Sequence, residues 1–497
     1  MLWAKKFWAK EWAAPGLLVG FVAAINIQKF FLDELAAARQ TRILVMFATL
    51  VILSGIYSSL VAAAVQQSGK RAVAMRPRWL ALLLFFCCIF TPSLLETDHF
   101  RYIIDGLAAA KGINPYRFSP AELQQLYGFD FFWVKEINHP EYHTIYPPLA
   151  QVLFVLSSYL NPFFWPHIFG TGFGFSLADA AFFRHFAAEF GLKVLTGSTC
   201  VLVVLLLRQR RFELVVLHPL FLFHVVSNAH VDALMLPGLL LVSRSVSWVR
   251  GTEFGAKSAN KDSCRFYFQI FGWLCALLIK WLPVVFFPIV FLRWWAKIGL
   301  KGTLLALLLS GALVTGVCFL YARGSDGAFF TSLLAYGNNW YFFGYGHWLF
   351  VSILDLLQVS DHPIQLAKLL ALACFSFGTV FLVWLYLKAF LSAQLSLALC
   401  ALVFFVFFPT LHPWYLLTLL ALGAPYLRVL PVFWFWPMLA LASHVCYLEG
   451  WSSNRVQFVV YAAVSLVLWR DLRRVTKRVH FNELFRISGH RFTKQAL

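Results

Sequence analysis

The fold of this chain is decided by a change from apolar to polar sequence within residues Trp79–Tyr116, WLALLLFFCCIFTPSLLETDHFRYIIDGLAAAKGINPY. The first part of this stretch, Trp79–Leu95, is an apolar run long enough for a membrane helix. Its second part, Leu94–Tyr116, is dense in polar and charged residues. We therefore expect a membrane span followed by a helix that lies outside it, at the membrane surface.

The polar part has the spacing of a helix with two unlike faces. Four polar residues would share one face: Asp98, Arg101, Tyr102 and Asp105. Apolar residues would occupy the other: Phe100, Ile103, Ile104 and Leu107. Gly112 and Pro115 then end the helix, because glycine tolerates a left-handed cap and proline cannot continue it. Without further context the same pattern also suits an ordinary surface helix with an Arg101–Asp105 ion pair.

The composition of the chain is that of a membrane protein. Of its 497 residues, 61% are hydrophobic and only 13% are charged, whereas about a quarter of the residues in soluble domains are charged. The net charge of +19 comes from short basic blocks between apolar runs, such as 70–78, 208–211 and 293–301. This pattern favours anionic lipid headgroups over nucleic acid as partners. The nine cysteines have no paired spacing in any loop, so neither a disulfide framework nor a zinc site is indicated.

The basic blocks also predict the topology, because cytoplasmic loops carry an excess of Lys and Arg. Residues 15–31 would run outward, 43–65 would return and 79–95 would run outward again. The first run lacks a small-residue cleavage site, so we expect it to stay as a span. The loop 96–146 would then lie outside, and it holds seven of the 22 acidic residues but only four of the 41 Lys and Arg. Long loops of this kind are usually functional.

The rest of the chain predicts about twelve to fourteen spans in all. Proline and glycine interrupt residues 147–189, which would form either two short spans or a re-entrant hairpin. Residues 212–227 would run outward as one span, and 266–292, with Lys280 and Pro283, would form a bent hairpin. Residues 323–347 would be an aromatic outer loop. We divide the chain into an N-terminal pair of spans (1–78), a transmembrane domain (79–470) and a basic cytoplasmic tail (471–497).

This topology places five polar clusters on the outer side. They are Asp98–Asp105, His139 with His143, His230 with Asp232, Asn338–Asn339 with His347, and His412. Ionisable residues at membrane depth are costly, so they are functional candidates. Each has a simpler interpretation as well. His412 precedes Pro413–Trp414 and would suit an interfacial aromatic belt, and Asp232 would suit the first residue of a helix. His139 and His143 are interpreted as loop surface.

Six short motifs together resemble the GT-C superfamily of glycosyltransferases, and more narrowly its polyprenol-phosphate-mannose-dependent mannosyltransferases. They are ETDHFRY (96–102), DG (105–106), GINPY (112–116), YPPLAQ (146–151), NAHVDAL (228–234) and HPWY (412–415). The similarity extends from about residue 79 to residue 430. The family often has a second acid next to the position of Asp98, where this chain has His99. The first two spans lie outside the similar region.

The resemblance implies a membrane enzyme with a GT-C-like bundle that transfers a sugar, mannose by analogy, from a polyprenyl monophosphate. An inverting transfer needs one base and no enzyme nucleophile, and Asp98 is our candidate for that base. Cationic groups should gather around the departing phosphate, and Arg101 matches phosphate geometry best. Lys280 would equally suit snorkelling or structural pairing. The residues expected to bind the donor phosphate or the substrate are His99, Arg101, Tyr102, Asp105, His230, Asp232, Lys280 and His412.

The partners implied are the polyprenyl-phosphate-sugar donor, a glycan, glycolipid or other envelope acceptor, and membrane lipids. The implied location is the bacterial inner membrane, with the site facing the periplasm. No metal or other cofactor is required, although Glu96 and Asp98 leave a divalent-ion variant open. Two alternatives stay open on the residues alone. Broken helices and intramembrane His and Asp would also suit a flippase or a proton-coupled transporter, and a lipid-carrier binding protein without catalysis is the third possibility.

Overall fold

A computed structural model describes twelve segments of the chain, namely residues 13–34, 39–66, 76–94, 96–129, 131–169, 181–207, 212–244, 256–360, 362–388, 390–427, 429–447 and 453–478. These segments contain twenty α-helices with short 3-10 and π-helical turns, and no β-strand. Only isolated bridges join Phe342 and Phe343 to Thr410. The predicted all-α class is therefore confirmed for the described residues.

The helices follow one another in the order α2 (Ala13–Glu34), α3 (Arg39–Gln66), α4 (Pro77–Phe90), α5 (Asp98–Ala110), α6 (Pro120–Tyr127), η1 (Phe132–Glu136), α7 (Pro148–Tyr159), η2 (Pro162–Phe164), α8 (Trp165–Phe169), α9 (Ala181–Leu207), α10 (Glu213–Val216), α11 (Pro219–Phe221), η3 (Leu222–Ser227), α12 (Asp232–Arg244), α13 (Ala256–Ile279), η4 (Leu282–Phe286), α14 (Phe287–Ala322), α15 (Ala328–Asn339), α16 (Tyr345–Leu357), α17 (Pro363–Leu387), α18 (Ala393–Phe407), η5 (Pro413–Tyr415), α19 (Leu416–Gly423), η6 (Ala424–Tyr426), α20 (Val432–Ala440), η7 (Leu441–Tyr447) and α21 (Ser453–Arg478).

Several of these helices are long and apolar enough to cross a membrane. Within the described residues there are four: Ile43–Ala63, His185–Leu207, Leu282–Ala322 and Pro363–Leu387. The bent pair Pro148–Tyr159 and Pro162–Phe169 would make a fifth. Seven other apolar helices have only 10–17 residues. The structure thus supports a multi-pass membrane protein, and the finer count of about twelve to fourteen spans stays a prediction.

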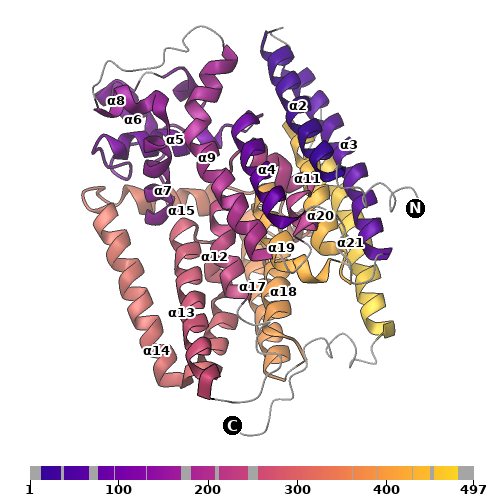
Figure 1. The fold of residues 1–497 in the computed structure, drawn as a ribbon. Helices are drawn as coiled ribbons and strands as arrows, with labels where there is room; N and C mark the ends of the chain where they lie inside the picture. Colours follow the sequence, from indigo (N-terminus) through magenta and orange to yellow (C-terminus); the bar gives the residue numbers. More distant parts are fainter. Residues whose placement is uncertain are drawn as a thin grey trace.

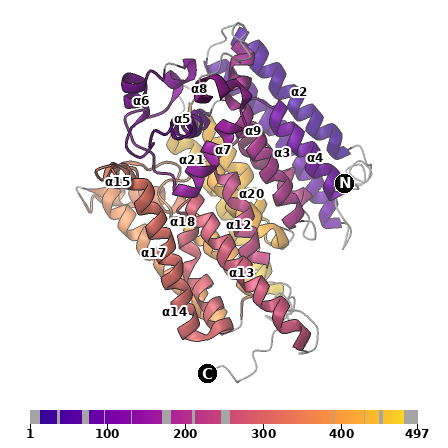
Figure 2. The ribbon, with the colours of Figure 1, turned by 60° about the vertical axis from the view of Figure 1, so that its left-hand side comes forward.

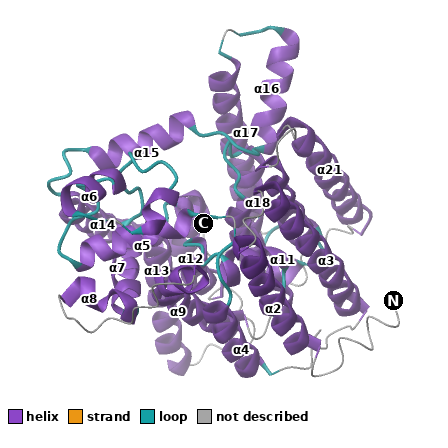
Figure 3. Cartoon of the chain, turned by 90° about the horizontal axis from the view of Figure 1, so that it is seen from above, coloured by secondary structure: helices purple, strands orange, loops and turns teal. Residues whose placement is uncertain are grey.

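The helices form one bundle with the short helices of the long loop gathered at one end. In Figure 1, α2 and α3 stand together on the right, while α5, α6 and α8 lie at the upper left, above α13 and α14. The turned view in Figure 2 keeps α5, α6 and α8 at that end. α4 packs along α9, α12 along α13, and α5 against α7. Seen from above, α16 and α17 stand beside each other at the edge of the molecule (Figure 3).

The centre of the molecule is the segment 212–236, in which every residue is buried. Our prediction of one continuous span over 212–227 was wrong. The chain there consists of α10, α11 and the π-helical turn η3, because extended His218 and the proline at 219 interrupt the helix. Tyr57 of α3 donates a hydrogen bond to the carbonyl of Leu214 at 2.7 Å, which ties the N-terminal helices to this centre.

The bend expected in residues 266–292 is present. α13 ends at Ile279, η4 follows, and Lys280 pairs with Asp232 at the start of α12. Arg293, further along, donates to the carbonyl of Val242 near the other end of α12 at 3.0 Å, so the chain has turned back. Gly299 then adopts a φ of 69°, which glycine allows at little cost, and divides α14 into two arms.

Other expectations need correction or stay open. Two helices had not been predicted: α15 lies inside the expected loop 323–347, and α16 follows it. α21 continues to Arg478, past the boundary predicted at residue 471, and residues 479–497 lie outside the described residues, so the cytoplasmic tail stays a prediction. Residues 147–169 bend by 81° between α7 and η2–α8. Either a broken span or a re-entrant hairpin fits that bend.

Loops that the sequence predicts on one side of the membrane contact one another. Asn114 donates to the carbonyl of Tyr321 at 2.8 Å, and the backbone N–H of His143 donates to Ser332 at 3.1 Å. The backbone N–H of Leu411 donates to the carbonyl of Phe342 at 2.7 Å. Segments that are far apart in the sequence therefore meet at the end of the bundle where α5 lies.

Candidate functional site

α5 is held close to α7, and this contact positions the polar face of α5. A Cβ atom at Gly106 would lie 2.2 Å from the carbonyl oxygen of Phe154, so only glycine permits the two helices to approach so closely. Asp105, which is fully buried, accepts hydrogen bonds from Arg101 Nε at 3.1 Å and from Gln151 Nε2 of α7 at 3.2 Å. The Arg101–Asp105 pair expected from the sequence is therefore present, and α7 supports it.

Four ionisable side chains from three segments form a continuous chain of contacts. Asp98 Oδ2 lies 3.4 Å from His230 Nε2, and His230 Nδ1 lies 2.9 Å from Asp232 Oδ2. Asp232 also pairs with Lys280, which follows α13. Tyr102 of α5 approaches His230 Nε2 through its hydroxyl at 3.2 Å. The structure thus brings together Asp98, Tyr102, His230, Asp232 and Lys280, although 182 residues separate the first from the last.

The local backbone explains how these side chains meet. Asp98 and Asp232 are the first residues of α5 and α12, where an acid interacts favourably with the helix dipole. Ala229, between η3 and α12, has a φ of 48°, an unusual value for a residue with a side chain. Such strained positions persist only where the surroundings hold them, and here the strained turn presents His230 to Asp98.

Asp98 is the accessible end of this chain. Its side chain is 31% exposed, whereas those of His230, Asp232 and Lys280 are 3%, 0% and 19% exposed. Burial raises the pKa of Asp98, but the hydrogen bond and the charge of His230, together with the charges of His412 and Lys280, outweigh burial and lower this pKa below its ordinary value. A carboxylate that is ionised and within reach of a bound molecule can accept a proton or meet a cation.

Aromatic rings enclose the group on one side. The His230 ring stacks on Trp414 with centroids 4.4 Å apart, and Trp414 stacks on His412 at 4.5 Å with an interplanar angle of 2°. Lys280 Nζ lies over the Tyr415 ring, 4.1 Å from its centroid. The hydroxyls of Tyr415 and Tyr336 are 2.5 Å apart, which brings α15 to the site. His412 therefore joins the group through stacking, and its interpretation as a belt residue does not account for this contact.

The contact with Asp105 leaves Arg101 at least one hydrogen-bond donor that is not used by any described residue. Its Nε is used by Asp105, while Nη2 is buried and has no hydrogen-bond partner among the described residues. The guanidinium has five N–H donors in a planar fork that matches phosphate or carboxylate oxygens. This cation could therefore hold an anionic ligand beside Asp98 without giving up its contact with Asp105.

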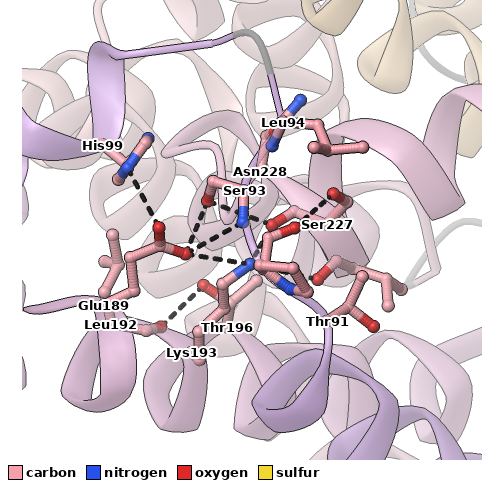
Figure 4. A network of polar contacts seen from close by, with 12 residues as sticks. Thr91, Ser93, Leu94, His99, Glu189, Leu192, Lys193, Thr196, Ser227 and Asn228 are labelled. Atoms are coloured by element: carbon pink, nitrogen blue, oxygen red, sulfur yellow. Dashed lines mark hydrogen bonds and ion pairs between the residues drawn. The ribbon is translucent and has the colours of Figure 1, made fainter. Parts of the chain in front are cut away.

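His99 does not join this group. Its ring is buried, and Nε2 lies 3.3 Å from Glu189 Oε1 of α9 (Figure 4). Glu189 accepts hydrogen bonds from the backbone N–H and the hydroxyl of Ser93 at 3.0 and 2.8 Å, and it lies 3.6 Å from Lys193 Nζ. Consecutive residues of a helix point about 100° apart, so Asp98 and His99 face different neighbours. The contacts of His99 are those of a residue that anchors the start of α5 on α9.

The remaining polar clusters of the outer loops have other neighbours. His139 lies 3.4 Å from Glu141 and packs against Trp340 with centroids 4.8 Å apart. His143 lies 3.3 Å from Glu122, and His347 packs against Tyr341. Lys368 donates to the carbonyls of Gly337 and Asn338. These residues hold the loops around α6 and α15 together, and none of these contacts reaches Asp98.

Sequence reasoning missed several residues that build the site. Glu189 and Lys193 are acid and base four residues apart inside an apolar run, a signal that marks buried ionisable groups. Gln151 belongs to the YPPLAQ motif, but the sequence indicated no role for it. His224 and His444 are buried together with Glu96 nearby, and their only sequence signal was a polar residue within an apolar segment; Glu96 had been named only with Asp98, as a possible divalent-ion ligand.

Taken together, an ionised and partly exposed carboxylate lies beside the buried pair His230–Asp232 and the less buried Lys280, with an arginine one helical turn along α5. Such a group can accept a proton at Asp98 while Arg101, Lys280 and His230 stabilise negative charge. In comparisons with protein-family models, with curated proteins and with solved structures, nothing matches this chain.

Proposed function

We propose that this protein is an integral membrane glycosyltransferase that moves a sugar from a polyprenyl-phosphate donor to an acceptor hydroxyl, with Asp98 as the general base. The observation that supports the proposal most strongly is the difference in exposure along the Asp98–His230–Asp232–Lys280 chain. Asp98 has the most exposed side chain of the four, at 31% against 19% for Lys280, and its neighbours His230, His412 and Lys280 keep its carboxyl ionised. This is the arrangement that proton abstraction requires.

In the proposed reaction, Asp98 accepts the proton of the acceptor hydroxyl. The acceptor oxygen forms a bond with the anomeric carbon of the sugar as the bond from that carbon to the phosphate oxygen breaks. The electron pair of the broken bond stays on the departing polyprenyl phosphate. Attack occurs opposite the leaving group, so the anomeric configuration inverts and no enzyme nucleophile takes part.

The departing phosphate gains negative charge, and cations aimed at it would lower the barrier. Arg101, with a buried Nη2 that has no partner among the described residues, suits a phosphate oxygen. Lys280 is balanced by Asp232 and supports the same region. Tyr102, Asp105 and His412 would position these groups or the sugar. His99, bound to Glu189, has no part in the proposed reaction.

The proposal includes the finer features expected from the sequence. The helices would form a GT-C-like bundle of about twelve to fourteen spans, with the loop 96–146 outside the cytoplasm. The site would face the periplasm of a bacterial inner membrane, and envelope glycans or glycolipids would be the acceptors. Mannose is proposed as the sugar because of the motif resemblance.

The direct test is a transfer assay with the purified full-length protein. The protein is incubated with polyprenyl-phosphate-[¹⁴C]mannose and a panel of lipid and oligosaccharide acceptors, and products are separated by chromatography. We expect label to move to at least one acceptor, with the opposite anomeric configuration. Donor that binds without being consumed across the whole panel would contradict the proposal.

A transporter is the second candidate, because the break at Lys280 between α13 and η4 resembles the broken helices that line transport sites. Reconstitution into vesicles separates the two functions. A transporter would move labelled lipid or solute across the membrane without forming a new glycosidic bond, whereas the proposed enzyme forms the bond at a fixed face.

A further inference from the structure

Three buried side chains outside the proposed catalytic chain meet at one point of the core. Glu96 precedes α5, His224 lies on η3 and His444 lies on η7, so three distant segments contribute one residue each. Their exposed fractions are 9%, 0% and 1%. One potential ligand atom of each residue lies within 4.8 Å of those of the other two.

Buried polar atoms of Glu96 and His224 are left without hydrogen bonds within the part of the chain that the structure describes. Both ring nitrogens of His224 and Glu96 Oε1 are buried and make no hydrogen bond with any described residue. Glu96 Oε1 approaches His444 Nδ1 at 3.5 Å without the geometry of a hydrogen bond. Burial of an ionisable carboxyl and an imidazole is costly unless something binds them. A cation bound between the three ligand atoms, which lie within 4.8 Å of one another, would satisfy them.

The type and spacing of the donors indicate which cation. Two imidazoles and a carboxylate suit Zn²⁺ and related transition-metal ions, whereas Mg²⁺ and Ca²⁺ prefer oxygen ligands alone. Bonds of about 2.0–2.2 Å to a tetrahedral ion place ligand atoms roughly 3.3–3.6 Å apart. The 3.5 Å between Glu96 and His444 fits this spacing, and small side-chain rotations would close the rest. His224 also lies on a π-helical turn, a feature found frequently at functional sites.

We propose that Glu96, His224 and His444 form a binding site for one divalent transition-metal ion, with Zn²⁺ as the best match. The ion would join the C-terminal segment around η7 to the start of α5, only two residues before Asp98. It would also stabilise the neighbouring aromatic stack, because His224 packs on Trp414 at 5.3 Å and Trp414 packs on His230. The site is separate from the catalytic chain and does not depend on the proposed transfer reaction.

The test measures metal in the full-length protein, purified in detergent through an affinity peptide that contains no histidine. After equilibration with Zn²⁺ and removal of free ion, zinc is counted by mass spectrometry. We expect the wild type to retain about one equivalent more than His444→Gln and Glu96→Gln, because each variant removes one ligand. Glu96→His should retain the ion, since it replaces one ligand by another.

The matched control is His218→Gln. His218 is as buried as His224, but its Nδ1 accepts a hydrogen bond from the backbone N–H of Leu220 at 3.0 Å, and its Nε2 lies 2.9 Å from the carbonyl oxygen of Trp434. This variant should bind zinc like the wild type. Co²⁺ in place of Zn²⁺ should give visible ligand-field absorption in the wild type that His444→Gln lacks.

A second measurement tests the metal site on the wild-type protein alone, in case the variants do not fold. Zn²⁺ should raise the melting midpoint of the wild type by a few degrees relative to chelator-treated protein, and Mg²⁺ should not, because only a ligand of the native state stabilises it. The proposal is overturned if folded variants hold as much zinc as the wild type. It is equally overturned if neither zinc content nor melting midpoint of the wild type responds to Zn²⁺ and chelator.

Discussion

In the proposed enzyme the Arg101 side chain has two roles. Its Nε pairs with Asp105, and its Nη2 is left to bind a phosphate oxygen. A lysine can satisfy only one of these, because its ammonium is a single point of charge. We expect Arg101→Lys to weaken donor use by on the order of tenfold or more. The measurement is KM for the polyprenyl-phosphate donor.

His139→Ala is the matched control, since His139 is a loop residue paired with exposed Glu141 and should tolerate the change. If both variants lost activity equally, general damage to the loop 96–146 would explain the loss, and the assigned role of Arg101 would be wrong.

Asp232 and Lys280 present a different case, because each compensates the charge of the other in the core. Loss of one partner leaves an uncompensated buried charge, so Asp232→Asn should destabilise the protein by about 3 kcal/mol or more. The double variant Asp232→Asn/Lys280→Met removes both charges and should recover most of the melting midpoint, while transfer stays lost. A double variant as unstable as the single one would show that the pair does not stabilise the fold.

Single residues could be predicted where a short motif specifies the chemistry. Asp98, His230 and Asp232 were selected by the predicted topology, the cost of ions in a membrane and the motif resemblance, and the structure brings them together, while Arg101 pairs with Asp105 one turn along α5. The contact of His99 with α9 could not be predicted, because spacing along α5 does not reveal which residues α9 presents to it. Glu189 is the missing partner, and contacts between residues 99 and 189 cannot be derived from local sequence.

At the level of helices, the position of α5 depends on its close approach to α7 at Gly106. An added methyl group would meet the Phe154 carbonyl oxygen at 2.2 Å and the Ser158 hydroxyl at 2.9 Å, and the carbonyl belongs to the backbone of a helix. We expect Gly106→Ala to lower stability by about 1–3 kcal/mol and to reduce transfer further by displacing Asp98. Melting midpoints and kcat measure the two effects.

Gly311→Ala in α14 provides the comparison, because nothing lies within 4 Å of a Cβ atom there. It should be neutral or stabilising by up to about 1 kcal/mol, as expected for alanine in a helix. Equal destabilisation by the two substitutions would contradict the assigned close contact.

Individual helices were predictable where long apolar runs have clear ends, as in α2, α3 and α17. The bend after α13 was also predictable, because Lys280 interrupts the apolar run and Pro283 cannot continue the helix. Hydrophobicity alone gave a wrong prediction of one span over residues 212–227. These residues are apolar because they are buried in the core, and the chain there does not form one helix. α15 and α16 were not predicted, because a segment rich in aromatic residues and glycine is also typical of a loop.

At the scale of the whole molecule, the proposed orientation places the loops around α5 outside and the bend at Gly299 inside. The second arm of α14, from Gly299 to Ala322, spans about 35 Å at 1.5 Å per residue, enough to separate the two sides. Exposed sites for cysteine labels exist at both ends: Glu141 and Gly337 near α5, and Lys301 after the bend.

We expect Glu141→Cys and Gly337→Cys to react with a membrane-impermeant maleimide in intact cells, relative to the wild-type chain as a blank. Lys301→Cys should react only after permeabilisation. The reverse pattern would invert the topology and remove the basis for a periplasmic site. The charge pattern predicts this orientation from the sequence, whereas the packing of the outer loops against one another required the structure.

The central claim is that Asp98 removes the proton of the acceptor, and Asp98→Asn tests it most directly. Asparagine keeps the shape and most hydrogen bonding but cannot accept that proton, and general-base catalysis contributes about 100- to 10,000-fold. We predict that kcat for transfer falls at least 100-fold, while donor-lipid binding and the melting midpoint stay near those of the wild type. Near-full turnover in Asp98→Asn, with loss of transfer in Asp232→Asn/Lys280→Met despite a recovered melting midpoint, would contradict this assignment and place the base elsewhere.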